Sequence, residues 1–344
     1  MVSGGAPGAT MARFTIATLS MVVLLALAMT LGAPFPFIAL LYITVFTFFL
    51  DKLTAFAAPD RPDAEFPAGD ALSVTLGLLH FPLLYGGVRV IAAGGLSVLD
   101  TVCLFAALGL FLGQVSNSNA HELIHRSPRA MRRLGVAVYS SVLFGFHASA
   151  HTRVHHVHAA TPNDPNSARM GEGYWRFAVR AWRGALVEGY RAERRLGRRG
   201  LSHPYTAYGM GAALSVLVAA TVAGLTGVVV LFGLAGYAQA QLLLSDYVQH
   251  YGLRRREVAP GRFEPVGPGH SWNAPHGFSS ALMLNAPRHS DHHAHPSQHY
   301  PGLELDRGTM PILPHSLPVM AVLALVPPLW RRVMDKRVRR WQPG

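Results

Sequence analysis

Long apolar stretches constrain the fold of this chain more than any other feature. A helix that crosses a bilayer needs about 17–25 predominantly apolar residues, and only helices or closed barrels satisfy their backbone hydrogen bonds in hydrocarbon. The sequence therefore predicts an all-α integral membrane protein with about six transmembrane helices. We place the spans at approximately residues 14–32, 35–50, 71–95, 98–116, 209–228 and 229–247.

Composition supports the membrane interpretation. Half of the residues are hydrophobic and 14% are charged, against roughly 25% charged in an average soluble domain. A cleaved signal peptide is the alternative for residues 14–32, but that run lacks a small-residue cleavage site and another span follows almost at once. The single cysteine, Cys103, lies inside the fourth span, which excludes disulfides and a cysteine-ligated iron–sulfur cluster.

The placement of basic residues predicts the orientation. The net charge is +12, and the excess lies in segments 117–206 and 249–344, whereas basic loops remain in the cytoplasm. We therefore expect both segments, both termini and a polar linker at 51–70 to be cytoplasmic. The whole chain, 1–344, is interpreted as one multi-pass domain of the inner (plasma) membrane. Its surroundings are membrane lipid, and no nucleic-acid partner is expected.

Histidines cluster in the segments that are predicted to be cytoplasmic. HELIH (121–125) continues the fourth span, and HTRVHH (151–156) and HSDHH (289–293) repeat the spacing of one helical turn, which places two imidazoles on a shared face. A lone histidine in DYVQHYGL (246–253) follows the last span. The candidate metal ligands are His121, His125, His151, His155, His156, His250, His289, His292 and His293.

The number of imidazoles favours two metal ions. Zinc takes about four ligands when structural and three protein ligands when catalytic, whereas nine imidazoles suit two iron ions with positions left open for oxygen. HELIH alone is also typical of a membrane zinc protease, with Glu122 as general base. That alternative leaves the HTRVHH and HSDHH motifs unused.

The ordered motifs HELIH, HTRVHH, HYGL and RHSDHHAHP, with ATPNDP, ARMGE and HSWN between them, resemble the integral-membrane di-iron alkane 1-monooxygenase (AlkB) family. This family lies within the membrane fatty acid desaturase/hydroxylase superfamily, and the likeness covers about residues 117–296. It implies an oxidoreductase in which the nine histidines hold two non-haem iron ions. It also implies hydroxylation of the terminal methyl of an n-alkane to a primary alcohol, with O2 and electrons from a rubredoxin-type donor and its reductase.

Two alternatives within the superfamily stay open: a fatty-acyl desaturase or hydroxylase, and a xylene-type methyl hydroxylase. The chain departs from the family pattern at Ala150 and Gln249, where the family commonly has glutamate. Carboxylates beside the ligands orient imidazoles and tune a metal. The acids left for that role here are Glu122, Asp164, Asp246 and Asp291, of which Glu122 and Asp291 are our candidates for supporting catalysis.

Four further expectations concern residues around the histidines. Phe46, Phe48 and Phe49, at the end of the second span, are candidates for closing a substrate channel, because apolar pockets select mainly by size. His80, inside the third span, is expected to hydrogen-bond between helices. The arginines at 169–199 and 254–256 are expected to steer an acidic electron donor. Five more histidines flank the clusters and could support the site: His147, His158, His270, His276 and His295.

Overall fold

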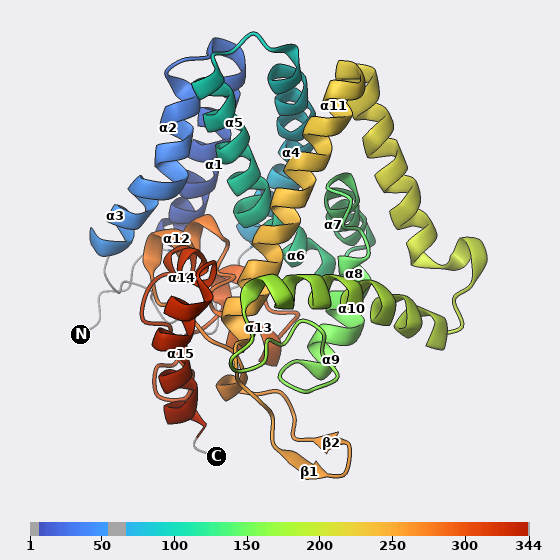
Figure 1. Ribbon diagram of the computed structural model, residues 1–344, viewed down its shortest axis with the longest axis vertical. Helices are drawn as coiled ribbons and strands as arrows, with labels where there is room; N and C mark the ends of the chain where they lie inside the picture. The colour runs from blue at the N-terminus through green and yellow to red at the C-terminus, as the bar shows by residue number, and fades with distance from the viewer. Residues whose placement is uncertain (1–6, 54–66, 343–344) are drawn as a thin grey trace.

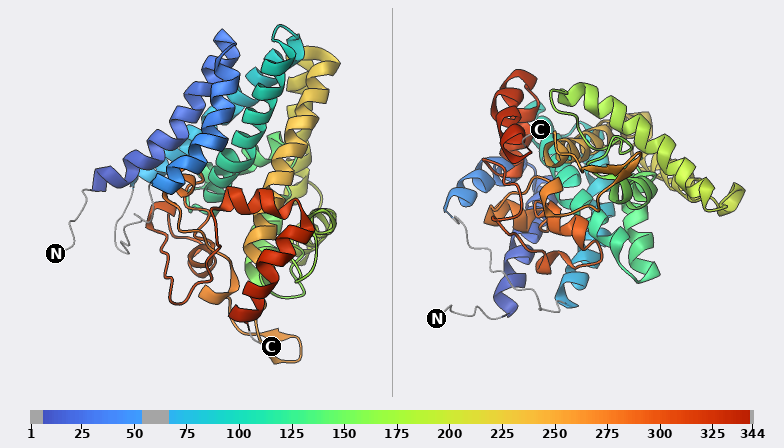
Figure 2. Two further views of the ribbon diagram at one scale, coloured as in Figure 1. Left: turned by 60° about the vertical axis from the view of Figure 1, so that its left-hand side comes forward. Right: turned by 90° about the horizontal axis from the view of Figure 1, so that it is seen from below.

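The computed structural model describes residues 7–53 and 67–342, which form long helices at one end of the molecule and short helices and loops at the other (Figures 1 and 2). The linker predicted at 51–70 falls largely on residues 54–66, which lie outside the described residues, as do residues 1–6 and 343–344. The long-helix end corresponds to the predicted spans.

The first four spans form two helical hairpins. The first pairs α1 (Pro7–Leu31) with a helix that runs as α2 (Phe35–Leu41), a π-helical turn (Tyr42–Phe46) and α3 (Thr47–Leu53). The second pairs α4 (Pro67–Ala93) with a helix that runs as α5 (Val98–Leu110), a π-helical turn (Phe111–Ser116) and α6 (Asn117–His125). The fourth span therefore carries HELIH at its end, as the sequence predicts.

The longest helix, α11 (Pro204–His250), is broken once. Ala223 and Gly224 leave the helical conformation, and Gly224 has φ +59°, which a residue without a Cβ adopts at little cost. The break divides α11 into two arms that run in opposite directions (Figure 1). We placed this boundary at 228/229, and the break lies five residues earlier, where the chain contains a glycine in the left-handed region.

Five helices of the described chain are long and apolar enough to cross a membrane, and α11 with its two arms is one of them. Their sides are largely apolar all round, which suits contact with lipid on one side and with other helices on the other. His80 of α4 is fully buried among them, with Nδ1 2.6 Å from Ser116 Oγ and Nε2 2.7 Å from Ser141 Oγ. The prediction of helix-to-helix hydrogen bonds at His80 is confirmed.

Shorter elements form the layer at the other end of the long helices. One of them, α10, runs across the molecule roughly perpendicular to the spans (Figure 1). One short helix, α7 (Arg129–Ser141), returns from this layer alongside α6 and ends beside His80 of α4. The other helices of the layer are α8 (His147–Ala150), α9 (His156–His158), α10 (Tyr174–Arg195), α12 (Gly277–Leu282), α13 (His289–Ala294), α14 (Leu317–Ala324) and α15 (Pro327–Trp341). A π-helical turn, His151–His155, joins α8 to α9, and 3-10 turns lie at Gly200–Ser202, Pro268–His270 and Tyr300–Gly302.

One small sheet corrects the all-α prediction. Strands β1 (Glu257–Ala259) and β2 (Arg262–Phe263) pair antiparallel, with Glu257 opposite Phe263. Gly261 in the turn has φ +70°, which favours glycine. The hairpin is exposed and extends away from the helices, so no apolar alternation marks it in the sequence.

Candidate metal centre

Four segments carry the candidate ligands to one place between the spans and the short-helix layer. His121 and His125 come from α6, and His250 ends α11. The HTRVHH motif forms the π-helical turn and α9, and HSDHH forms α13. All nine histidines lie in two groups, and within each group the ligand atoms lie within 4.8 Å of one another. The first histidine group is His121, His125, His151, His156 and His292; the second histidine group is His155, His250, His289 and His293.

The division between the groups differs from the face-sharing that we inferred for HTRVHH. His151 and His155 belong to different groups, and His151 is paired with His156, whose Nε2 lies 2.9 Å from its own. The reason is local: residues 151–155 form a π-helical turn, in which hydrogen bonds join residues five apart rather than four apart. One motif therefore serves both groups.

The ring nitrogens converge in a manner that hydrogen bonding does not explain. His151 Nε2 lies 2.7 Å from His121 Nε2 and 2.9 Å from His156 Nε2. In the second group, His289 Nε2 lies 2.9 Å from His250 Nε2 and 3.1 Å from His293 Nε2. Each ring nitrogen has one in-plane lone pair or one hydrogen, so it cannot bond two neighbours. Neighbouring imidazoles on one metal ion, each bound at about 2.0–2.1 Å, have nitrogens about 3 Å apart.

Two buried ring nitrogens strengthen the fit to metal ions. Nε2 of His125, in the first group, and Nε2 of His155, in the second, have no hydrogen-bond partner among the described residues. A buried polar atom without a partner is costly, and coordination of a metal would satisfy both. The donor set, nine imidazoles without a cysteine, is compatible with iron, as it is with zinc, copper and nickel.

Burial keeps most of the imidazoles outside the spans in the form that binds metals. It lowers the pKa of His151, His156, His292 and His293 well below the usual histidine value, and it lowers the pKa of His289 to about 3. A ligand imidazole must be neutral. The buried site therefore holds these rings ready for a cation.

His155 is the exception, because a carboxylate adjoins it. Burial, the largest single effect, disfavours its charged form, but the charge and hydrogen bond of Asp164, together with the charge of Asp246, raise the pKa of His155. His155 Nδ1 donates to Asp164 Oδ2 at 2.9 Å, which leaves Nε2 free to face the second group. This arrangement of carboxylate, imidazole and ligand nitrogen is the one that orients metal-bound histidines.

Asp164 also fixes its own loop. Its Oδ1 accepts from the backbone N–H of Asn166 at 3.0 Å, and its Oδ2 accepts from Ser167 Oγ at 2.7 Å. Asn166 Nδ2 in turn donates to Asp246 Oδ2 at 2.6 Å. Asp164 therefore serves as the turn residue before Pro165 and as a partner of a candidate ligand.

The carboxylates of Glu122 and Asp291 do not hydrogen-bond any of the nine candidate ligands among the described residues. Glu122 Oε1 lies 3.3 Å from a guanidinium nitrogen of Arg126 and accepts from the backbone N–H of Tyr300. Asp291 Oδ1 accepts from His295 Nδ1 at 2.8 Å, and its Oδ2 accepts from the backbone N–H of Glu304. Both carboxylates thus connect ligand-bearing helices to the segment that follows α13.

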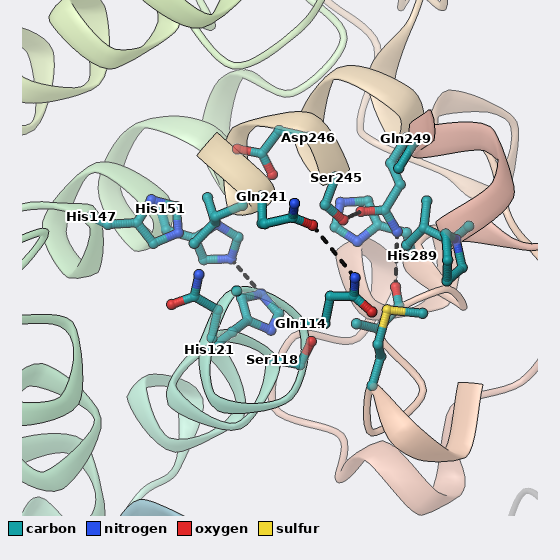
Figure 3. A pocket seen from close by; sticks show the side chains of 18 of the residues that line it. Gln114, Ser118, His121, His147, His151, Gln241, Ser245, Asp246, Gln249 and His289 are labelled. Carbon is teal, nitrogen blue, oxygen red and sulfur yellow. Dashed lines mark hydrogen bonds between the residues drawn. The ribbon is translucent and has the colours of Figure 1, made fainter. Parts of the chain in front are cut away.

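A cavity opens beside both histidine groups and is lined by His121, His151 and His289 (Figure 3). Its wall is largely apolar but contains several polar side chains: Gln114, Asn117, Ser118, Gln241, Ser245, Asp246 and Gln249. We did not single out Gln114, Asn117 and Gln241 from the sequence, although a polar residue in or at the end of a predicted span is a general signal for a functional position.

An apolar recess of about 780 Å³ adjoins this cavity and opens between the spans and α14. Phe48 and Phe49 line the recess, as does Leu110 of α5. The recess and the cavity share four wall residues, Gln114, Gln241, Pro318 and Ala321. Gln114 Nε2 lies 3.5 Å from Gln241 Oε1 at this junction. An apolar chain could therefore reach the histidines from the membrane side.

Comparison with known proteins identifies the family. The profile described as fatty acid desaturase matches residues 98–322. Alkane 1-monooxygenase 2 of Alcanivorax borkumensis is 32% identical over 79% of this chain and 72% of its own length. Alkane 1-monooxygenase 1 of Pseudomonas aeruginosa is 33% identical over 83% of this chain and 78% of its own length. The chain belongs to the fatty acid desaturase family, in its alkane 1-monooxygenase branch.

Membership in the alkane 1-monooxygenase branch makes the protein a membrane oxidoreductase, a hydroxylase of the desaturase superfamily. The xylene/toluene monooxygenase hydroxylase component of Pseudomonas putida is more distant, with 27% identity over 64% of this chain. The resemblance inferred from the histidine motifs is thereby confirmed. The zinc protease alternative explains neither these relatives nor the second histidine group.

The two departures from the pattern of the alkane 1-monooxygenase branch have distinct surroundings. Gln249 Nε2 donates to the carbonyl of Ala286 at 2.9 Å, and its Oε1 accepts from Ser245 Oγ. A carboxylate at this position could not donate to that carbonyl. Ala150 is buried where α8 packs closely against α10. A Cβ added at Gly189 of α10 would lie 3.1 Å from the backbone nitrogen of Ala150.

Proposed function

We propose that the chain is a non-haem di-iron monooxygenase that hydroxylates the terminal methyl group of an n-alkane. The observation that carries the proposal is the convergence of nine imidazoles in two groups beside a cavity that adjoins an apolar recess. The reaction converts R–CH3, O2, two electrons and two protons into R–CH2OH and water. A rubredoxin-type protein, with its reductase, supplies the electrons.

The proposed topology has six spans in the inner membrane, with both termini and the histidine layer in the cytoplasm. The break at Gly224 supports six, because each arm of α11 then crosses once. The arginines of the short-helix layer support the orientation, since basic segments remain inside. Residues 1–344 form one domain, because the ligands come from spans and layer alike.

The proposed ligand residues are the two histidine groups. Two bound irons would supply the activation of O2 that cleavage of an unactivated C–H bond requires. The protein positions the substrate, because a methyl group offers no polar handle and is held by the shape of its surroundings. Asp164 holds the His155 ring in place through its Nδ1 hydrogen, and the buried helices keep bulk water from the cavity.

Substrate would enter through the apolar recess. Phe48 and Phe49 line it, whereas Phe46 stacks on Tyr42 and meets Phe278 edge-on. Of the three phenylalanines that we considered, Phe48 and Phe49 are thus placed to limit chain length.

The donor would dock on the arginine-bearing face of the layer. Arg256 is exposed beside Glu264, and Arg255 donates to the carbonyl of Val157, one residue after the ligand motif. Arg254 donates to the carbonyl of Leu253 and is half-buried. Arg255 is half-buried as well, so the exposed Arg256 is the residue of this group that an acidic partner reaches most readily.

A second candidate function, hydroxylation of an acyl or otherwise oxygenated chain, is favoured by a polar side chain in the wall of the cavity. Asn117 Nδ2 donates to the carbonyl of Ala238, and its buried Oδ1 has no partner among the described residues. An unpaired acceptor in this cavity would suit a hydroxyl group on the bound chain. A bare alkane leaves it unpaired.

The test is turnover by protein in lipid nanodiscs with a rubredoxin, its reductase and O2. Octane, hexadecane, p-xylene and 1-octanol are supplied in separate reactions, and the products are identified by mass spectrometry. We expect 1-octanol from octane, about two irons per chain, and loss of both activity and iron in His292→Ala. Tightly bound zinc without iron would contradict the di-iron proposal. Turnover of 1-octanol or an acyl chain in preference to octane would favour the second candidate.

A further inference from the structure

A cleft of about 430 Å³ beside the start of α7 gathers arginines from three segments of the chain. Three belong to the first turns of α7, a fourth to the HTRVHH motif, and the fifth follows α10. The arginines are Arg129, Arg132, Arg133, Arg153 and Arg198. Glu193 is the one carboxylate among the described residues that line it. The cleft therefore carries a large excess of positive charge.

The single carboxylate is already neutralised. Glu193 is buried, pairs with Arg198 and accepts from Ser149 Oγ at 2.7 Å. Arg132 donates only to neutral groups, the backbone carbonyls of Arg126 and Ser127. In the described chain, Arg129, Arg133 and Arg153 make no ion pair with a carboxylate.

Four guanidinium groups without a counter-charge therefore face one cleft. Like charges that line one cleft repel one another, and a bound anion relieves that repulsion. Guanidinium groups bind phosphate oxygens in pairs of parallel hydrogen bonds, which makes phosphate the anion that such a cluster suits best.

The depth of the cleft follows from helix geometry. Ser141, near the end of α7, hydrogen-bonds His80, which lies in the middle of the α4 span. Arg133 and Arg129 precede Ser141 by eight and twelve residues, so they lie about 12–18 Å nearer the histidine end at 1.5 Å per residue. Asp70, in the first turn of α4, precedes His80 by ten residues, or about 15 Å. The arginines thus lie level with the end of a span, where lipid headgroups lie.

We infer that this cleft binds the phosphate of an anionic phospholipid headgroup. Basic pockets between spans on the cytoplasmic side are typical binding places for such headgroups. The inner lining from Ile124, Val136 and Ala148 is apolar and suits the glycerol and first methylenes of the lipid. The site neighbours the metal centre, because Arg153 lies between His151 and His155 in the π-helical turn. A bound lipid would hold that turn against α7.

The inference is independent of the reaction that the protein catalyses, and lipid retention tests it. The full-length protein is placed in nanodiscs of phosphatidylcholine with a tenth part of phosphatidylglycerol. It is then released, and the retained lipids are counted by native mass spectrometry. Arg129→Gln/Arg133→Gln removes two cleft charges. Arg339→Gln/Arg340→Gln, at the exposed end of α15, is the matched control because it removes the same charge elsewhere. Iron content and thermal unfolding verify that each variant is folded.

We expect wild-type protein to retain phosphatidylglycerol in preference to phosphatidylcholine. In the cleft variant the ratio of retained phosphatidylglycerol to phosphatidylcholine should fall roughly ten- to thirtyfold, because each arginine near a lipid surface contributes about 1 kcal/mol. The control variant should keep it. Equal loss in both variants, or none in either, would overturn the inference. Inorganic phosphate at millimolar concentration is a second arm: displacement of the lipid by free phosphate would show a phosphate site without lipid selectivity. A cleft variant that retains lipid but loses donor-dependent turnover would show a protein-docking surface instead.

Discussion

Replacement of Asp164 by asparagine should weaken the second histidine group without dismantling the fold. Asp164 accepts from His155 Nδ1 at 2.9 Å, and both groups are buried. Asparagine has nearly the same shape, and its carbonyl oxygen can still accept from His155 or from the backbone of Asn166. The main effect of the change is therefore to remove a negative charge. In the wild type this charge orients the imidazole and makes it more basic.

The expected magnitude follows from the role of such a partner. Loss of a group that orients a metal-bound histidine typically costs 10–100-fold in metal affinity, or about 1.4–2.7 kcal/mol. Because Asp164 contacts the second group alone, the metal of that group should be lost first. Challenge with a chelator should leave Asp164→Asn with about one iron per chain under conditions in which the wild type keeps about two.

Asp291→Asn is the matched control. Asp291 is also a buried carboxylate that accepts from a histidine, but that histidine, His295, belongs to neither group. Its iron retention should stay within about threefold of wild type. Iron content, measured by mass spectrometry after timed dialysis against chelator, checks both variants. Equal iron loss in Asp164→Asn and Asp291→Asn would refute the assignment of Asp164 as the orienting partner of His155.

Three further predictions address the recess, the donor and the core. Phe48→Ala should shift the preferred alkane toward longer chains, while Phe46→Ala should not, because Phe48 lines the recess and Phe46 does not; an identical chain-length profile in the two variants would contradict this. Arg255→Glu with Arg256→Glu should slow turnover with a rubredoxin at unchanged iron content, and turnover by wild type should fall as ionic strength rises from roughly 0.02 to 0.3 M; rates indifferent to both changes would exclude this face as the docking site. Trp330→Ala should lower the free energy of unfolding by about 3–5 kcal/mol, since Trp330 is fully buried against Tyr247, and a midpoint equal to wild type in denaturant titration would contradict this.

The membrane helices and the metal centre differ in how far the sequence predicts them. Apolar length is a property of each segment by itself, so the long helices agree with the predicted runs to within a few residues at most ends. Histidine spacing is also local, so HELIH and HSDHH could be expected on helices and were found there. The break in α11 is less well predicted, because no change of hydrophobicity marks Gly224 within an apolar run.

The partners of the histidines were harder to predict because they lie far apart in sequence. Of the four remaining acids we favoured Glu122 and Asp291 as supports, yet Asp164 contacts a candidate ligand, whereas Glu122 and Asp291 contact other groups. The same holds for Gln114 and Gln241, which meet at the wall between cavity and recess although they belong to α11 and to the turn after α5.

The sequence by itself determined that this chain is a helical membrane protein, which nine histidines are candidate ligands, and to which family it belongs. These depend on apolar length, on spacing within one helix and on motif order. The tertiary structure alone decided how the nine divide into five and four, which carboxylate serves His155, and where the apolar recess meets the cavity. The physical reason is that a ligand group forms only where separate helices pack closely enough to bring their ring nitrogens within about 3 Å of one another. How helices pack against each other cannot be predicted from the sequence of any single helix.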